Sequence, residues 1–288
     1  MARTDHRARH HERIAEVLGG ATEGAERVPY PIGMRELEIR GTRRVGAGLI
    51  RVTLGGPELE GFQTHAADDH IKFLYPEESG ELNLPRKDGL MLHWPRDPRP
   101  ITREYTVRRY DAAAGELDID IALHPGGLGS DWAEAVAPGA RIHVAGPPGG
   151  VIVPPRYDRY LMAGDITALP AMDRWLEELP RDAAGWALIE VIDASEEIPL
   201  DPPPGFQVRW LHRGEAAPGT SDVLERAVAE LPQEVPDGER WYCWLAGEAG
   251  VLKPLRRWVA EAWKLPKHDQ DITGYWKLGV ADFDEDDH

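Results

Sequence analysis

Cysteine is almost absent from this sequence, which has only Cys243 in 288 residues. A single cysteine excludes an internal disulfide, a paired-cysteine redox motif and a zinc or iron–sulfur site built from several thiolates. Long apolar runs are also missing: no stretch of 18 apolar residues occurs, and the Arg- and His-rich beginning has no apolar signal-peptide region. We therefore expect a soluble, cytoplasmic protein without membrane insertion.

Positive charge is scarce relative to negative charge. The chain has 33 Lys and Arg residues against 50 Asp and Glu residues, which gives a formal net charge of −17. Surfaces that bind nucleic acid are built from clustered Lys and Arg, so this balance argues against a nucleic-acid partner. The chain ends in a run of acidic residues, and we expect a disordered acidic tail over 281–288.

Several catalytic signatures are absent as well. The sequence contains no Gly-x-Ser-x-Gly elbow and no Walker A motif, so it gives no support to a hydrolase or an NTPase. The segment His65–His70 has the composition of a metal site, but a polar loop leading into a strand explains it more simply. His6, His10 and His11 lie in a stretch expected to be mobile. The sequence therefore predicts no metal site.

The chain is long enough for two domains, and its character changes near residue 150. Residues 1–30 predict a peripheral helix in which Ile14, Val17 and Leu18 form a short apolar stripe. Residues 31–150 are rich in strand signals, and the alternation over 117–123 is typical of a half-buried antiparallel strand. Recurring turn signals between such runs predict a small antiparallel β-barrel.

Residues 151–280 predict a different fold. After the breaker-rich segment 146–155, strands with a buried character alternate with helical stretches such as 171–179 and 222–231. The expected strands are 160–163, 186–191, 207–211 and 241–246. Because strands that alternate with helices form parallel sheets, this half is predicted to be an α/β domain.

The strand-like segment 103–106 has side chains suited to a flavin diphosphate. A guanidinium offers a planar fork of donors to a phosphate, so Arg103 can hold the pyrophosphate. Residues i and i+2 of a strand share a face, so Tyr105 is expected to lie against the isoalloxazine ring. Thr106 can reach the reactive N5 edge, which makes Tyr105 and Thr106 the candidate catalytic residues. Arg108 or Arg109 can add charge at the phosphates.

A glycine-rich turn, His124-Pro-Gly-Gly-Leu-Gly-Ser130, follows some twenty residues later. Gly127 and Gly129 let the backbone approach a phosphate closely, and Ser130 is a good N-cap for a helix that begins there. A helix N-terminus preceded by glycines favours an anion. Either segment alone is more often an ordinary strand or connection, but their order and spacing favour a flavin-dependent oxidoreductase.

Two strand-to-helix turns of the second half are predicted to bind a nicotinamide dinucleotide. One follows the strand at 160–163 and places Pro170 in the first turn of a helix. The other follows the strand at 241–246. Ligands of open α/β sheets bind at the carboxyl ends of the strands, so both turns should lie at one sheet edge. The candidate residues are Asp165, Thr167, Ala168, Gly247 and Glu248.

Taken in order, these motifs resemble the siderophore-interacting proteins, which are FAD-dependent ferric-siderophore reductases with a fold like that of ferredoxin–NADP reductases. The resemblance covers roughly residues 30–280. Five motifs carry it: Arg103-x-Tyr105-Thr106-x-Arg108, His124 with Gly127–Ala133, Gly164–Ala171, Ala246–Glu248 and Tyr275–Gly279.

The resemblance implies that Arg103, Tyr105, Thr106, His124 and the turn Gly127-Leu128-Gly129-Ser130 contact FAD. It also implies that Asp165, Thr167, Ala168 and Glu248 line the nicotinamide side. Family members carry basic residues near the flavin that attract an anionic ferric siderophore, and Lys72 and Lys277 match those places. Trp276 is a further candidate contact for the flavin or the substrate. The expected reaction is hydride transfer from NADPH or NADH to FAD, then single-electron transfers to ferric iron.

The phosphate turn departs from the family pattern Gly-Pro-Ala-Ser, because Leu128 and Gly129 stand in its middle. Asp131 occupies a position that is often basic. Neither change removes backbone amides, but both are expected to weaken the binding of FAD.

The residues leave several choices open. Arg213 or Arg209 would favour NADPH through its 2′-phosphate, whereas Asp193 and Glu196 would favour NADH through ribose hydroxyls. A ferredoxin is an alternative electron donor, and the class of siderophore and the oligomeric state stay open. A flavin reductase with another acceptor and a siderophore carrier without turnover are the rival functions.

Overall fold

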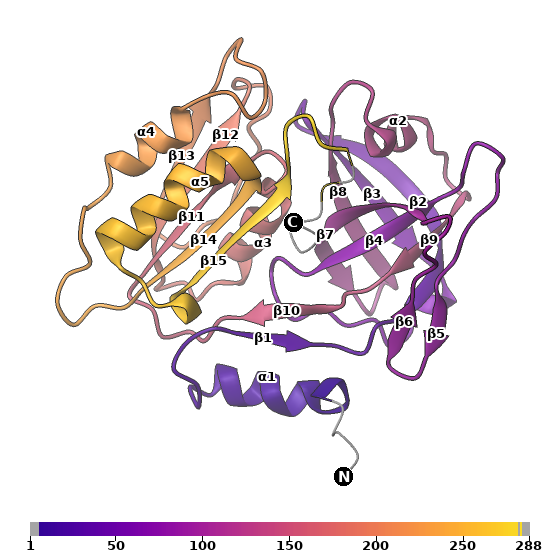
Figure 1. Ribbon diagram of the computed structural model, residues 1–288, viewed down its shortest axis with the longest axis horizontal. Helices are drawn as coiled ribbons and strands as arrows, with labels where there is room; N and C mark the ends of the chain where they lie inside the picture. Colours follow the sequence, from indigo (N-terminus) through magenta and orange to yellow (C-terminus); the bar gives the residue numbers. More distant parts are fainter. Residues whose placement is uncertain (1–5, 282, 284–288) are drawn as a thin grey trace. The chain divides into compact units, whose positions relative to one another are not determined.

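The computed structural model describes residues 6–281 and residue 283, which divide into two compact units (Figure 1). The barrel unit contains the described residues up to Gly19, Glu26–Val45 and Leu49–Ile152. The sheet unit contains Gly20–Ala25, Gly46–Gly48 and the described residues from Val153 onward. The predicted acidic tail, apart from residues 281 and 283, lies outside the described residues. Within them, no helix has the length and apolar character needed to span a membrane.

Six antiparallel strands close the barrel, as the sequence predicts (Figure 1). In barrel order they are β2 (Met34–Val45), β3 (Leu49–Gly55), β8 (Glu116–Ala122), β7 (Ile101–Asp111), β4 (His70–Tyr75) and β9 (Arg141–Ala145). Alternate residues of each strand point inward, so Leu117, Ile119 and Ile121 of β8 lie in the core.

Peripheral elements complete the barrel unit. β1 (Glu26–Pro29) pairs with β10 (Gly149–Ile152), and α1 (His10–Leu18) lies beside them (Figure 1). Ile14 and Val17 of α1 are buried, as expected, but Leu18 is 48% exposed. Inclusion of Leu18 in the apolar stripe was wrong: it shares the side of the helix that carries Ile14, but it is the last residue of α1 and stays exposed there. The remaining elements are the hairpin of β5 (Arg86–Asp88) and β6 (Met91–His93), helix α2 (Leu128–Ala135) and 3-10 turns at His6–Arg9 and Pro57–Leu59.

Five parallel strands form the sheet unit, which confirms the predicted α/β domain. Their order is β13 (Gly205–His212), β12 (Ala184–Val191), β11 (Arg159–Asp165), β14 (Trp241–Glu248) and β15 (Gln270–Trp276). The sequence did not predict β15. This strand is half-buried at an edge of the sheet and mixes polar residues with glycine, so it lacks the continuous apolar run of the central strands.

Helices cover both faces of this sheet (Figure 1). α4 (Val223–Ala229) and α5 (Ala249–Trp258) pack on the face that buries Leu161 and Cys243. Trp175 of α3 (Leu169–Glu178) meets Tyr242 on the opposite face. Pro170 lies in the first turn of α3, as predicted. A π turn (Val259–Trp263) continues α5, and a 3-10 turn (Lys267–Asp269) precedes β15.

Candidate functional site

In the barrel unit, Arg103 and Tyr105 lie on one face of β7, opposite Phe73 and Ile71 of β4. The Tyr105 hydroxyl lies 3.0 Å from the hydroxyl of Tyr75, and its ring meets Phe73 edge to face. Burial raises the pKa of Tyr105, while the nearby Arg103 guanidinium opposes that shift. The side chains predicted to hold a phosphate and to lie against a flavin ring are therefore neighbours.

The N-terminus of α2 packs against the same tyrosine. A Cβ atom at Gly129 would collide with the Tyr105 hydroxyl oxygen, and one at Gly127 would collide with the ring of His124. Glycine at these two positions thus lets Tyr105 and His124 approach the first turn of the helix. The first amides of a helix have no carbonyl partner within it, so this turn offers donors to an anion beside Arg103.

Ser130 does not cap this helix, which corrects the prediction. The N-cap is Gly127, and Ser130 lies inside the first turn of α2. Its hydroxyl accepts a hydrogen bond from the His124 amide at 2.9 Å and donates to the Ala122 carbonyl at 3.2 Å. A serine within the first turn reaches back to the preceding strand more readily than forward to the helix amides. Ser130 therefore fixes the turn that joins β8 to α2.

Thr106 and Arg108 are both buried, and β7 changes register just after Val107. A bulge between Val107 and Arg109 places Arg109 opposite Asp118 on the outer surface of the barrel. The charge of Arg108 acts on Arg51. The bulge thus directs Arg109 to the outer surface, while Arg108 stays a predicted contact for the phosphates.

Lys72 is paired with a residue that the sequence did not single out. Its ammonium nitrogen lies 2.8 Å from the Glu104 carboxylate, and His70 lies 3.9 Å from the same group. Burial alone would raise the pKa of Glu104, but His70 and Lys72 outweigh it and hold that pKa below its ordinary value. The positive charge predicted to attract a substrate is therefore balanced locally by Glu104.

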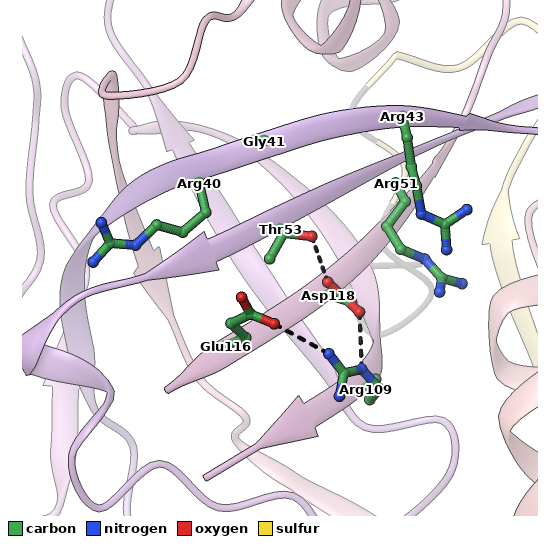
Figure 2. A pocket seen from close by; sticks show the side chains of 8 residues that line it. All are labelled: Arg40, Gly41, Arg43, Arg51, Thr53, Arg109, Glu116 and Asp118. Carbon is green, nitrogen blue, oxygen red and sulfur yellow. Dashed lines mark hydrogen bonds and ion pairs between the residues drawn. The ribbon is translucent and has the colours of Figure 1, made fainter. Parts of the chain in front are cut away.

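An arginine-lined hollow on the outside of the barrel has a volume of about 440 Å³. Figure 2 shows the side chains that line it. Its lining residues are Arg40, Gly41, Arg43, Arg51, Thr53, Arg109, Glu116 and Asp118. Arg109 bonds to Asp118 at 3.0 Å, and Arg51 bonds to Asp120 through two nitrogens at 2.6 and 2.7 Å. The carboxylates of Asp118 and Asp120 thus neutralise the charges of Arg109 and Arg51, so we assign no ligand to the hollow.

In the sheet unit, Asp165 ties together the ends of three strands. One carboxylate oxygen accepts hydrogen bonds from the Thr167 amide at 2.9 Å and its hydroxyl at 2.5 Å. The other accepts from the Glu248 amide at 3.0 Å and the Trp276 indole at 2.8 Å. Burial raises the pKa of Asp165, and these hydrogen bonds oppose the shift. The network joins the turns after β11 and β14 to the end of β15.

Glu248 caps the helix that follows. It is the N-cap of α5, and its carboxylate accepts hydrogen bonds from the amides of Val251 at 2.7 Å and Leu278 at 3.0 Å. Gly247 has a φ of 139°, a conformation that favours glycine. Ala168 is fully buried in the turn after β11. The candidate nicotinamide residues therefore gather at one edge of the sheet, and Trp276 joins them through its indole nitrogen.

Sequence reasoning missed Glu190, a buried carboxylate at the end of β12. It lines a small cavity with Asp165 and Glu248, and its carboxylate accepts a hydrogen bond from Ser221 at 2.8 Å. Burial raises the pKa of Glu190, and the charge of Asp165 adds to the rise. An acidic residue inside an otherwise apolar strand was the signal that could have identified it.

The residues expected to choose between donors are engaged with neighbours. Arg213 lies 4.0 Å from Glu190, and Arg209 pairs with Glu230 at 2.8 Å. Asp193 and Glu196 accept backbone amides within their own turn, from Ser195 and Ile192 respectively. Lys277 is exposed just after β15.

An antiparallel barrel and a five-stranded parallel sheet in one chain form the architecture of the ferredoxin–NADP reductases. This architecture and a match to an FAD-binding domain together define an FAD-dependent oxidoreductase. The chain belongs to the siderophore-interacting protein family. Residues 38–151 match the model of the siderophore-interacting FAD-binding domain, and residues 157–279 match that of the siderophore-interacting protein.

Relatives agree with this assignment. Ferric vibriobactin reductase ViuB of Vibrio cholerae is 35% identical over 259 residues, which cover 88% of this chain and 92% of ViuB. An NADPH-dependent ferric-chelate reductase of Escherichia coli is 35% identical over 240 residues, covering 82% and 91%. The crystal structure of a siderophore utilization protein from T. fusca matches with a TM-score of 0.84 and 42% identity, covering 90% of this chain and 98% of that one.

The residues present fit the flavin cofactor of the family. Arg103 offers a planar guanidinium and Tyr105 an aromatic face, and the two lie on one strand face. The first turn of α2, with small residues at its contact with Tyr105, supplies backbone donors next to them. A phosphate and a ring each have a partner of suitable chemistry.

Proposed function

We propose that this protein is a reductase that takes electrons from NADPH and delivers them through FAD to the ferric ion of a siderophore. The observation that carries the proposal is that one chain contains both the FAD-binding domain of the family and the Asp165 network at the carboxyl edge of a parallel sheet. The names of the Vibrio and Escherichia coli relatives support the substrate and the donor.

The chain's own residues would bind and orient the cofactor. Arg103 neutralises a phosphate, and the amides of Leu128, Gly129 and Ser130 donate to the same group. Tyr105 lies against the ring, and Thr106 is the candidate donor at its reactive edge. When bound, FAD accepts a hydride from the dinucleotide and passes on single electrons.

Residues of the sheet unit would bind the dinucleotide. Asp165 holds the turns that carry Thr167 and Glu248 in fixed positions, because each donates to its carboxylate. Thr167, Ala168 and Gly247 would then line the nicotinamide side. Arg213, held near Glu190, and Arg209 are the candidate contacts for the 2′-phosphate that distinguishes NADPH.

The iron is substrate, and its chemistry explains the release. One hydride carries two electrons, so one NADPH reduces two ferric ions to ferrous ions and leaves NADP⁺ and a proton. Siderophores bind ferric iron through hard oxygen donors, and the softer ferrous ion binds to them more weakly. Lys72 and Lys277 are the proposed attractants for an anionic ferric chelate.

An anaerobic absorbance titration of the FAD-reconstituted protein tests the proposal. NADPH, NADH and a reduced ferredoxin are added in separate experiments, followed by a ferric siderophore and a ferrous-ion trap. We expect NADPH to bleach the flavin absorbance and the siderophore to restore it, with two ferrous ions trapped per NADPH. Bleaching without recovery would point to a flavin reductase with another acceptor. Failure of every donor to bleach bound FAD would favour a carrier.

The attraction of the substrate has its own test. Replacement of Lys72 and Lys277 by alanine should raise KM for an anionic ferric siderophore and leave the reduction of a neutral acceptor nearly unchanged. Exposed Lys87 and Lys253 provide the matched double variant. Equal losses with both acceptors would refute the electrostatic role.

A further inference from the structure

Three histidines from two distant segments of the barrel unit converge beside β1. His10 and His11 begin α1, and His65 lies in the loop before β4. One ring nitrogen of each lies within 4.8 Å of those of the other two. Ring centroids are 3.9 Å apart for His10 and His11, and 5.4 Å apart for His11 and His65. Neighbouring residues of a helix normally point apart, so helix geometry does not impose this arrangement.

The surroundings of His10 determine which of its ring nitrogens has the lone pair. Its Nδ1 lies 2.8 Å from the Arg7 carbonyl oxygen, which only accepts, so Nδ1 carries the proton in the neutral ring. The lone pair is then on Nε2, 2.8 Å from the side-chain oxygen Oε1 of Gln63. With the Gln63 amide turned over, its NH2 group donates to this lone pair, and a bound metal ion would take the place of that donor. A histidine that donates from Nδ1 to a backbone carbonyl is a common outer support for a metal ligand.

The loop that carries His65 is already fixed in place. One oxygen of the buried Asp69 accepts hydrogen bonds from the Thr64 hydroxyl at 2.9 Å, the His65 amide at 2.6 Å and the Ala66 amide at 3.0 Å. Ala66 packs in the same apolar cluster as Ile14 of α1. The helix and the loop are therefore positioned against each other without a ligand, as a preformed site requires.

We propose that His10, His11 and His65 form a binding site for a divalent transition-metal ion, with zinc as the test ion. Imidazole nitrogens suit zinc and its neighbours in the first transition row. Three nitrogens about 2.0–2.1 Å from a tetrahedral zinc lie roughly 3.4 Å apart. Because the three nitrogens lie within 4.8 Å of one another, the rings must close by at most about 1.4 Å. His11 is exposed, and its side chain has room to turn. The site uses no residue assigned to FAD, the dinucleotide or the siderophore.

Calorimetric titration of the full-length, FAD-loaded protein with zinc chloride, after removal of metals with a chelator, tests this proposal. We expect one equivalent to bind and the thermal midpoint of unfolding to rise. His11→Ala and His65→Ala should each weaken binding by about tenfold or more. His6→Ala is the matched control, because His6 is an exposed histidine on the preceding turn and lies outside the cluster.

Two results would overturn the site. One is the absence of saturable zinc binding to the wild-type protein. The other is binding of equal strength in the His11 and His65 variants, whose thermal midpoints without zinc report that they are folded.

Discussion

In the barrel unit the candidate flavin residues are held by packing, with the Tyr105 hydroxyl seated against Gly129 and its ring against Phe73. In the sheet unit the candidate dinucleotide residues are held by one carboxylate, Asp165, which accepts four hydrogen bonds. The first arrangement depends on the shapes of the packed side chains. The second depends on the buried carboxylate of Asp165, because its removal would leave hydrogen-bond donors from three segments without an acceptor.

The largest effect is expected at that carboxylate. Asp165→Ala leaves the Trp276 indole and the amides of Thr167 and Glu248 without their acceptor. Each buried donor left unpaired costs about 1–3 kcal/mol, so the free energy of unfolding should fall by about 3 kcal/mol or more. Urea denaturation followed by tryptophan fluorescence measures it.

Asp193→Ala is the matched control for this change, since Asp193 accepts the Ser195 amide in an exposed turn. Its effect on the free energy of unfolding should be much smaller, because water can replace an exposed acceptor. If both variants lose the same small amount, the sheet-unit site is not held by the Asp165 network, and the contrast between the two units fails.

The next effect concerns the anion side of the barrel unit. Arg103→Ala should weaken FAD binding by about 1.5–3 kcal/mol, roughly ten- to a hundredfold, because a charge-assisted hydrogen bond to phosphate is lost. Titration of apoprotein with FAD, followed by quenching of flavin fluorescence, measures the affinity. Arg141→Ala, which removes an exposed barrel arginine paired with Glu36, should bind FAD normally. If Arg103→Ala binds FAD as tightly as the wild type, Arg103 does not bind a phosphate of FAD.

Packing in the barrel unit can be tested with a double-mutant cycle. Gly129→Ala inserts a methyl group where the Tyr105 hydroxyl lies, and overpacking of this kind costs about 1–3 kcal/mol. Tyr105→Phe removes the hydroxyl, after which the nearest ring atom, Cζ, lies 3.1 Å from the new carbon. The double variant should therefore be destabilised less than the sum of the two single changes. Strict additivity of the unfolding free energies would show that Gly129 and Tyr105 do not interact.

The two units also differ in how much the sequence could predict. Alternation over 117–123 predicts the barrel strand β8, although the structure buries its outer face too, where Asp118 and Asp120 pair with arginines. The apolar run at 186–191 predicts a central strand of the parallel sheet, because burial on both faces leaves a continuous apolar pattern. β15 could not be predicted in this way, because an edge strand needs neither strict alternation nor a continuous apolar run.

Site details that depend on register could not be predicted. The Tyr75–Tyr105 contact and the Lys72–Glu104 pair join β4 to β7, and local sequence does not encode which residues face each other across strands. The bulge at Val107 and Arg109 redirects a charge that simple alternation would place elsewhere. Ser130 shows the same limit on a smaller scale: its residue type suits a cap, but the helix begins two residues earlier.

The smallest effect on the free energy of unfolding is expected at Glu104, where a change of charge can be separated from a change of packing in the barrel unit. Glu104 is 46% exposed and pairs with Lys72, so Glu104→Gln should change the unfolding free energy by less than about 1 kcal/mol. His70 and Lys72 lower the pKa of Glu104 in the folded protein. A lowered pKa contributes stability above the unfolded pKa, near 4.5, and that contribution is lost as the pH falls through the folded value.

Thermal midpoints measured across this acid range should therefore fall less steeply for Glu104→Gln than for the wild type. The same variant removes the negative charge of Glu104 beside Lys72, so KM for an anionic ferric siderophore should decrease by no more than about fivefold, while KM for a neutral acceptor stays constant. Asp88→Asn, at an exposed carboxylate that faces His93 on the β5–β6 hairpin, is the matched control and should leave both values unchanged. If KM rises instead, Glu104 helps to bind the chelate, and charge as well as packing shapes the barrel-unit site.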